Sequence, residues 1–225
     1  MAAVILLVGC STRMIEKKAV ELDAVKLNVL GVRLFLYPGV YPPDMSSVFL
    51  LKNVMINDGD EVLDLGTGTG IQAIFAARGA RRVVATDIDP LAVENARDNV
   101  AYHGLEGKIE VRQGDLFEPI SPDERFNVII FSPCFPREVP EDTNEILNGT
   151  FTDRCWDVTL RFFSEAEGHL KEGGRIFYLM GFEANMPHVR RIIAENELRI
   201  KNSSAVLLDE VMYEVFELTP LRASD

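Results

Sequence analysis

The fold of this chain is decided by residues 61–74, which read Glu-Val-Leu-Asp-Leu-Gly-Thr-Gly-Thr-Gly-Ile-Gln-Ala-Ile. A short apolar run breaks at three alternate glycines and continues into apolar positions with helical spacing, so the pattern predicts a strand, a tight loop and a helix. Glycines permit positive φ and leave no side chain in the way of a ligand, and the next helix offers unpaired N–H groups. The stretch therefore predicts a ligand-binding loop.

The spacing of these glycines separates two kinds of nucleotide-binding loop. A dinucleotide fingerprint, Gly-x-Gly-x-x-Gly/Ala counted from Gly66, would need a small residue where this chain has Ile71. The observed spacing resembles that of class I S-adenosylmethionine-dependent methyltransferases. The resemblance implies that the loop binds the methionine part of the cofactor through a set of five residues: Asp64, Gly66, Thr67, Gly68 and Gly70.

Acidic residues end the next two predicted strands. Asp87 follows the apolar run 82–86 and lies 87 − 66 = 21 positions after Gly66, close to the interval of about 20 expected for an acid that binds ribose hydroxyls. The resemblance implies that Ile88 also borders the cofactor, that Asp115 accepts from the adenine amine and that Leu116 packs on the ring. The alternative interpretations are a cap at Asp87 or Asp89 for a predicted helix over residues 90–102, and a plain turn at Asp115.

The apolar run 126–131 predicts a strand in the middle of a sheet that is covered on both faces. It ends in Ser132-Pro133-Cys134-Phe135, which resembles the (Asn/Asp/Ser)-Pro-Pro-(Tyr/Phe/Trp) motif of amino-methyltransferases. The resemblance implies that Ser132 and the Pro133 carbonyl orient the target nitrogen, that Ser132 also borders the cofactor, and that Phe135 packs on the target. Cys134 replaces the second Pro, and Ser132 stands where glutamine-specific members have Asn. Residues 147–163 resemble the release-factor glutamine methyltransferases.

The alternation of strands and helices predicts an α/β fold with a doubly wound, mostly parallel seven-stranded sheet. Its last strands, about 200–207 and 210–218, are expected to form an antiparallel edge hairpin. We expect residues 1–45 to form an N-terminal extension and residues 46–225 the methyltransferase domain. The extension should hold a short amphipathic helix over residues 14–26 and an aromatic, Pro-rich stretch that is either a lid or a packed hairpin.

Two details of the extension are also predicted. The apolar run 2–8 favours a first strand, or a native start of translation near Met14, over an export signal, because it lacks a basic n-region. Ser46 or Ser47 is a candidate cap for the helix that follows.

Composition limits the compartment and the partners. The chain carries 23 Lys and Arg against 35 Asp and Glu, a net charge of −12, which on average repels bare phosphate backbones. Its 3 cysteines are widely spaced, which argues for a reducing, cytoplasmic compartment and against disulfides or thiolate-bound zinc. The 3 histidines are scattered, so we expect no metal site, and no apolar stretch is long enough to predict a membrane span.

The expected function is methyl transfer from S-adenosylmethionine to a nitrogen, most simply a protein glutamine or another planar amide or amine. An RNA or DNA base and a small molecule are alternative acceptors. A nicotinamide-dependent oxidoreductase or a non-catalytic cofactor-binding module is the alternative from another class, because an acid such as Asp87 also binds the ribose of nicotinamide cofactors.

Overall fold

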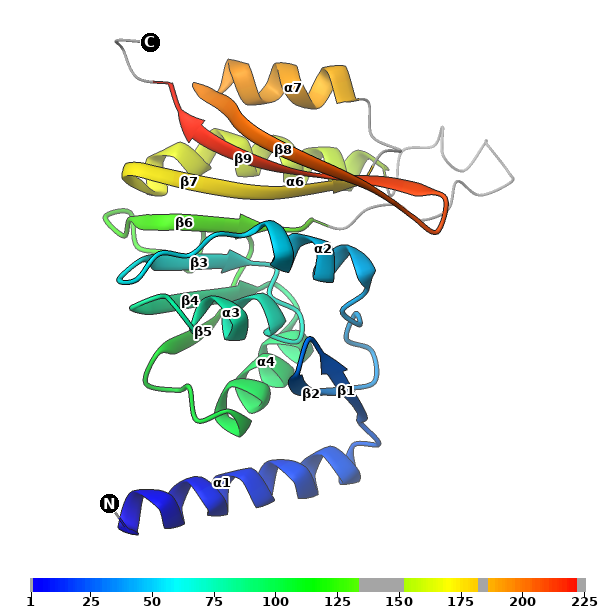
Figure 1. The fold of residues 1–225 in the computed structure, drawn as a ribbon, viewed down its shortest axis with the longest axis vertical. Coiled ribbons are helices and arrows are strands. Elements are labelled where there is room, and N and C mark those ends of the chain that lie inside the picture. The colour runs from blue at the N-terminus through cyan, green and yellow to red at the C-terminus, as the bar shows by residue number, and fades with distance from the viewer. Residues whose placement is uncertain (1, 134–151, 182–185, 222–225) are drawn as a thin grey trace. The chain divides into compact units, whose positions relative to one another are not determined.

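A computed structural model describes residues 2–133, 152–181 and 186–221 of the 225-residue chain (Figure 1). The chain divides into two compact units, Met1–Pro119 and Ile120–Asp225, and each is described by itself.

The first unit contains three parallel strands in the order β5-β4-β3 and the helices that connect them. These elements are β3 (Glu61–Leu65), α3 (Ile71–Ala76), β4 (Arg82–Asp87), α4 (Pro90–Tyr102) and β5 (Ile109–Gln113). Leu63 in β3 and Val84 in β4 are completely buried. The strand, glycine loop and helix predicted over 61–74 are therefore present, because a buried strand of this kind reads as a continuous apolar run.

The N-terminal part of the first unit consists of α1 (Ala2–Glu21), β1 (Val25–Val29), β2 (Val32–Leu36) and α2 (Met45–Asn53). The strand predicted over residues 2–8 is wrong, because these residues continue the helix that the sequence predicted only from Met14. Ala and Leu are strong helix formers, and an apolar run this short is compatible with a helix as well as with a strand.

The aromatic stretch of the extension begins within the packed hairpin β1–β2, so it does not form an open loop over its whole length. Phe35 and Tyr37 are buried in one apolar cluster with Ile15 and Ala19 of α1 and Ala92 of α4. The hairpin is thus attached to the helix that follows β4. The boundary between extension and domain at residues 45 and 46 stays a prediction.

Helix α2 is capped by Asp44, not by the two serines that the sequence suggested. The Asp44 carboxylate accepts from the Ser47 amide at 2.9 Å, and the Ser47 hydroxyl accepts from the Asp44 amide at 3.4 Å. This is a capping box in which Ser47 occupies the third helical position. The predicted caps lie two and three residues after the observed one, and Asp is as good an N-cap residue as Ser.

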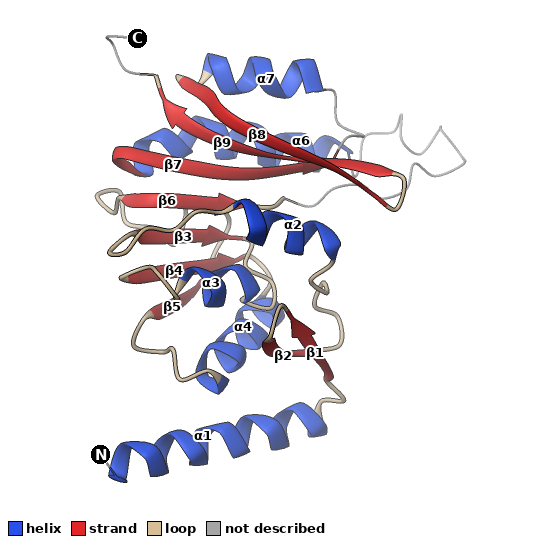
Figure 2. Cartoon of the chain, in the orientation of Figure 1, coloured by secondary structure: helices blue, strands red, loops and turns tan. Residues whose placement is uncertain are grey.

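The described residues of the second unit form four strands in the order β6-β7-β9-β8, with β6 and β7 parallel and the others antiparallel. Its elements are β6 (Phe126–Phe131), α6 (Thr152–Ala166), a short 3₁₀ helix (Glu167–His169), β7 (Leu170–Gly181), α7 (Met186–Glu195), β8 (Leu198–Leu208) and β9 (Val211–Pro220). Figure 2 shows β8 and β9 as a long antiparallel ribbon. The predicted α/β class, with a mostly parallel seven-stranded sheet and an antiparallel C-terminal hairpin, is confirmed.

Candidate cofactor-binding site

The three glycines of the loop between β3 and α3 all have positive φ, +65° at Gly66, +55° at Gly68 and +84° at Gly70, a region that other residues enter at a cost. Their surroundings differ. A Cβ on Gly70 would lie 3.4 Å from Cα and Cβ of Ala96 in α4, whereas a Cβ on Gly68 would meet nothing within 4 Å. Gly70 therefore permits helix packing, and Gly68 borders open space into which a ligand could fit.

Backbone hydrogen bonds hold this loop against the end of β4. The Thr67 amide donates to the Thr86 carbonyl at 2.9 Å, and the Gly68 amide donates to Oδ2 of Asp87 at 2.8 Å. The two strand ends that the sequence assigned to one ligand are therefore directly bonded to each other.

Asp87 is the centre of this arrangement. Its Oδ1 accepts from the Asp89 amide at 3.0 Å, and its own carbonyl accepts from the Gly114 amide at 3.0 Å. Burial raises the pKa of the Asp87 carboxyl, while the Gly68 and Asp89 amides oppose that rise. A carboxylate offers about four lone-pair sites, so Asp87 can support the loop and still accept from a ligand hydroxyl. The neighbouring Ile88 is 64% exposed and presents an apolar surface there.

The turn after β5 also lies at the end of β4, next to Asp87. Gly114, which donates to the Asp87 carbonyl, precedes Asp115 and Leu116. Asp115 forms a tight turn with Glu118, whose amide donates to the Asp115 carbonyl at 2.9 Å, and Leu116 has φ +47°. The plain turn proposed as an alternative is thus present, and it also brings Asp115 and Leu116 to the end of β4.

Asp64 lies beneath the loop and is 2% exposed. Its carboxyl accepts from Oγ1 of Thr67 at 2.6 Å and from the backbone of Ala73. Burial raises the pKa of Asp64 to about 7, against the opposing effect of these two hydrogen bonds. These contacts connect β3, the loop and α3. Asp64 therefore has a structural part in the loop, and its predicted contact with the cofactor stays a prediction.

Sequence reasoning missed Gln72, in the first turn of α3. Its side chain is 7% exposed, and Nε2 donates to the Ser47 carbonyl at 3.1 Å. Within the described part of the chain, Oε1 of Gln72 is a buried acceptor without a hydrogen-bond partner, which is a costly condition in a folded protein. A glutamine at a helix start matches no motif, so only the structure reveals it.

The predicted acceptor motif lies in the second unit, where β6 ends. Ser132 is half-buried and Pro133 is buried. Phe135, Cys134 and residues 147–149 of the downstream resemblance lie outside the described residues.

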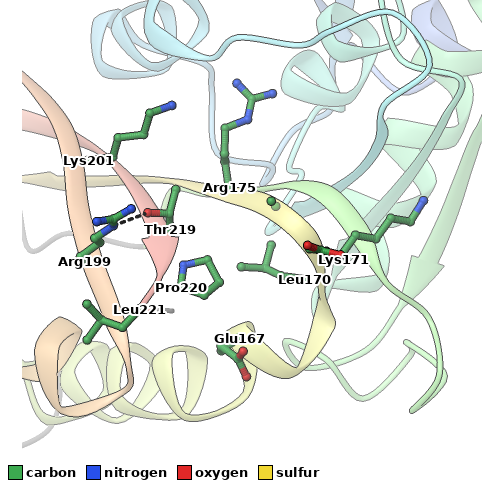
Figure 3. A pocket seen from close by; sticks show the side chains of 12 residues that line it. Glu167, Leu170, Lys171, Arg175, Arg199, Lys201, Thr219, Pro220 and Leu221 are labelled. Carbon is green, nitrogen blue, oxygen red and sulfur yellow. Dashed lines mark hydrogen bonds between the residues drawn. The ribbon is translucent and has the colours of Figure 1, made fainter. Parts of the chain in front are cut away.

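A hollow of about 500 Å³ lies elsewhere in the second unit, at the amino end of β7 (Figure 3). Its basic lining residues are Lys171, Arg175, Arg199 and Lys201. Arg199 donates to Oγ1 of Thr219 at 3.3 Å, and Lys201 lies 2.9 Å from the Glu217 carboxylate. Because β6 and β7 are parallel, this hollow is at the opposite end of the strand pair from Ser132. Ligands of such sheets bind at the carboxyl ends of the strands, so the hollow is not assigned to the reaction.

Among the residues that the structure describes, no cluster of three or more His, Cys, Asp or Glu side chains could hold a metal ion. Within the same ranges, none of the helices is both long and apolar enough to cross a membrane.

Comparison with known proteins shows whether the glycine loop is that of a dinucleotide-binding protein or that of a methyltransferase. The family model described as methyltransferase small domain matches residues 32–204. The chain belongs to this family. It is therefore a methyltransferase, and S-adenosylmethionine is its cofactor. The glycine spacing and the chemistry of the site agree with this cofactor.

Relatives of this methyltransferase differ in the acceptors that their names state. A Methanocaldococcus jannaschii protein, provisionally named a protein N5-glutamine methyltransferase, is 34% identical over 152 residues, 66% of this chain and 75% of the relative. An Alcanivorax borkumensis protein named ribosomal RNA small subunit methyltransferase C is 28% identical over 181 residues, 78% of this chain and 50% of that protein. The solved ribosomal protein L11 methylase of Lactobacillus delbrueckii shares the fold, with a TM-score of 0.61, 21% identity, and coverage of 83% of this chain and 84% of the other.

Replacing Gly68 by alanine is expected to weaken S-adenosylmethionine binding about tenfold or more, because the added Cβ enters the open space beside the loop. Gly104→Ala is the matched control, since Gly104 has φ +65° and equally open surroundings but follows the C-terminal end of α4. Both variants should lose similar thermal stability. Calorimetric titration that finds equal cofactor affinities in the two variants would contradict the placement of the ligand beside Gly68.

The buried Asp64 should make stability depend on pH in a predictable direction. Its pKa is about 7 in the folded protein and near 4 when unfolded, so the folded state holds the proton more tightly. The stability that this neutral carboxyl contributes is present below pH 4 and is lost as pH rises to about 7. Asp64→Asn cannot ionise. Relative to wild type it should gain on the order of 2 kcal/mol of unfolding free energy between pH 5 and pH 8. Denaturant unfolding that gives the same difference at both pH values would refute this interpretation.

Proposed function

We propose that this methyltransferase acts on the nitrogen of a planar amide or amine, and that the amide of a protein glutamine is its acceptor. The observation that carries the proposal is the position of Ser132 and Pro133 at the end of the buried strand β6. Their resemblance to the amino-methyltransferase motif implies that they orient the acceptor nitrogen.

The end of β6 rests on a packed aromatic core. The ring of Phe131 lies 4.6 Å from that of Phe162 and 5.9 Å from that of Tyr178, measured between centroids. The Tyr178 hydroxyl lies 3.1 Å from Oγ1 of the buried Thr159. Such contacts restrict the strand end, and a group that directly follows a rigid strand can hold a target more accurately than one in the middle of a loop. This supports an orienting role for Ser132.

In the proposed reaction, a bond forms between the acceptor nitrogen and the methyl carbon while the carbon–sulfur bond of S-adenosylmethionine breaks and its electron pair stays on sulfur. The acceptor nitrogen then loses one proton to solvent. Ser132 Oγ and the Pro133 carbonyl would accept hydrogen bonds from the acceptor N–H groups and aim the nitrogen lone pair, with Phe135 against its plane. Positioning of this kind can supply a large part of the rate enhancement of a displacement.

On the cofactor side, we propose that Asp87 accepts from the ribose hydroxyls, that Ile88, Asp115 and Leu116 contact the adenine, and that Gly68 borders the methionine part. The hydrogen bonds among the ends of β3, β4 and β5 support this assignment, because they bring these residues to one edge of the first unit.

Two observations favour a protein acceptor. The net charge of −12 opposes general binding of nucleic acid, and the M. jannaschii relative is named for glutamine methylation. The A. borkumensis relative, named for ribosomal RNA, makes an RNA base the second candidate. The cysteine content supports a cytoplasmic location.

Ser132→Ala should lower the turnover number on the true acceptor roughly tenfold to a hundredfold at saturating cofactor, because the acceptor nitrogen is then less well aligned. Ser164→Ala is the control, since its hydroxyl donates to the Arg161 carbonyl on the exposed side of α6. Radiolabelled methyl transfer to a Gly-Gly-Gln peptide and to ribosomal RNA should be measured for both variants.

Label in the glutamine peptide that depends on Ser132 would support the proposal. Label in RNA alone would replace the glutamine acceptor with a base, and full activity of Ser132→Ala would remove the strand-end motif from the reaction.

A further inference from the structure

The side chain of Asn99, in α4, joins the cofactor loop to the N-terminal hairpin. It is completely buried. Its Nδ2 donates to two carbonyls, those of Thr69 in the loop and Phe35 in β2, each at 2.9 Å. Its Oδ1 accepts from the Phe35 amide at 2.8 Å. Both N–H groups and the carbonyl of the carboxamide are therefore used, and all three bonds are to main-chain atoms.

Asn95, one turn earlier in α4, makes a similar contact that does not reach the loop. It is also completely buried. Its Nδ2 donates to the Phe35 carbonyl at 2.8 Å, and its Oδ1 accepts from the Tyr37 amide at 3.2 Å. The two asparagines share a helix, a degree of burial and a strand, but only Asn99 bonds to Thr69.

Together these amides act on β2 as a neighbouring strand would. Among the strands that the structure describes, β2 pairs with β1 alone, in a two-stranded sheet, and Phe35 lies opposite Lys26. The N–H and carbonyl of Phe35 bond to Asn99 and Asn95 instead of a third strand. Buried main-chain polar groups need such partners, so the hairpin is fixed to α4 by directional bonds as well as by the apolar contacts of Phe35 and Tyr37.

The Thr69 carbonyl lies between two of the glycines whose backbone forms the loop. Gly68 donates to Asp87 on one side of Thr69, and Gly70 donates to the Thr67 carbonyl at 2.8 Å on the other. With the third bond, from Asn99 to Thr69 itself, the peptide units of this turn have fixed orientations. Flexible glycines lose much conformational freedom when they are ordered, and a loop that is ordered beforehand does not incur that cost on binding.

We infer that Asn99 is a positioning residue for S-adenosylmethionine, and that the β1–β2 hairpin supports the cofactor loop through it. The inference rests on the proposed placement of the cofactor at the Gly68 turn. It gives residues 25–36 a part in cofactor affinity although they need not contact the ligand.

Asn99→Ala and Asn95→Ala form a matched pair for testing this inference. Each removes one buried amide that binds β2 and so should lower the unfolding free energy, by more in Asn99→Ala because that change breaks three hydrogen bonds instead of two. Only Asn99→Ala releases the Thr69 carbonyl, and calorimetric titration with S-adenosylhomocysteine should show its affinity reduced about tenfold, with less than about a threefold change in Asn95→Ala.

Equal affinities in the two variants would overturn the inference while leaving the proposed function intact. Failure of the wild-type protein to bind S-adenosylhomocysteine would overturn both, so the two failures are distinguishable without any acceptor.

A second measurement needs no variant. Linkage requires that, if the hydrogen bonds of Asn99 to Thr69 and Phe35 favour the binding-competent loop, the bound ligand in turn favours those hydrogen bonds. Hydrogen exchange of the Phe35 amide, which donates to Asn99, should therefore slow when S-adenosylhomocysteine binds. The Gly31 amide, which donates to Oδ1 of Asn28 at 2.9 Å in the same hairpin, should keep its rate. Unchanged protection at Phe35 would overturn the inference even if Asn99→Ala does not fold.

Discussion

The carboxylate of Asp87 is the group on which the proposed site most depends. One oxygen accepts from the Gly68 amide and the other from the Asp89 amide, so a single side chain holds the glycine loop and the start of α4. The Asp87 carbonyl also accepts from the Gly114 amide, and this bond attaches the turn after β5 to the end of β4. Burial makes the charged form less favourable, as the raised pKa shows, and the backbone amides offset this cost. Asp87, which the sequence predicted to bind ribose, therefore also joins the glycine loop, the start of α4 and the turn after β5.

The glycine motif likewise combines ligand binding with folding. Gly70 has its Cβ position next to Ala96 of α4, whereas Gly68 has open space there. Asp64 is covered and bonded to Thr67, although the resemblance assigned it to the cofactor. A motif of this kind identifies the ligand because its spacing is specific, but it does not say which of its members touch that ligand.

Elements defined by local patterns could be predicted from the sequence. The bounds predicted for α4 and β6 agree with the structure, because Asp89 and Pro90 mark the start of α4 and an apolar run defines the buried strand. The fold class followed from the same alternation. Features that depend on contacts between distant segments could not be read in this way.

Asn99 shows why such features stay hidden. It bonds to Phe35, 64 positions away, and to Thr69, 30 positions away, and in the sequence it is an ordinary polar position of a helix. Gln72 is similar, because its contact with Ser47 spans 25 positions. The error at residues 2–8 has a different cause, since a short apolar run is compatible with either a strand or a helix.

Titration of S-adenosylhomocysteine into Asp87→Asn and Asp89→Asn tests the role of Asp87 most directly. The two variants remove equal charge from neighbouring positions, but Asp89 caps α4 through the Leu91 amide and asparagine is an equally good cap. We predict that Asp87→Asn weakens binding about tenfold or more, because a charged acceptor of ribose hydroxyls is lost, while Asp89→Asn stays within about threefold of wild type. Equal affinity of Asp87→Asn and wild type would contradict the placement of the cofactor at the end of β4.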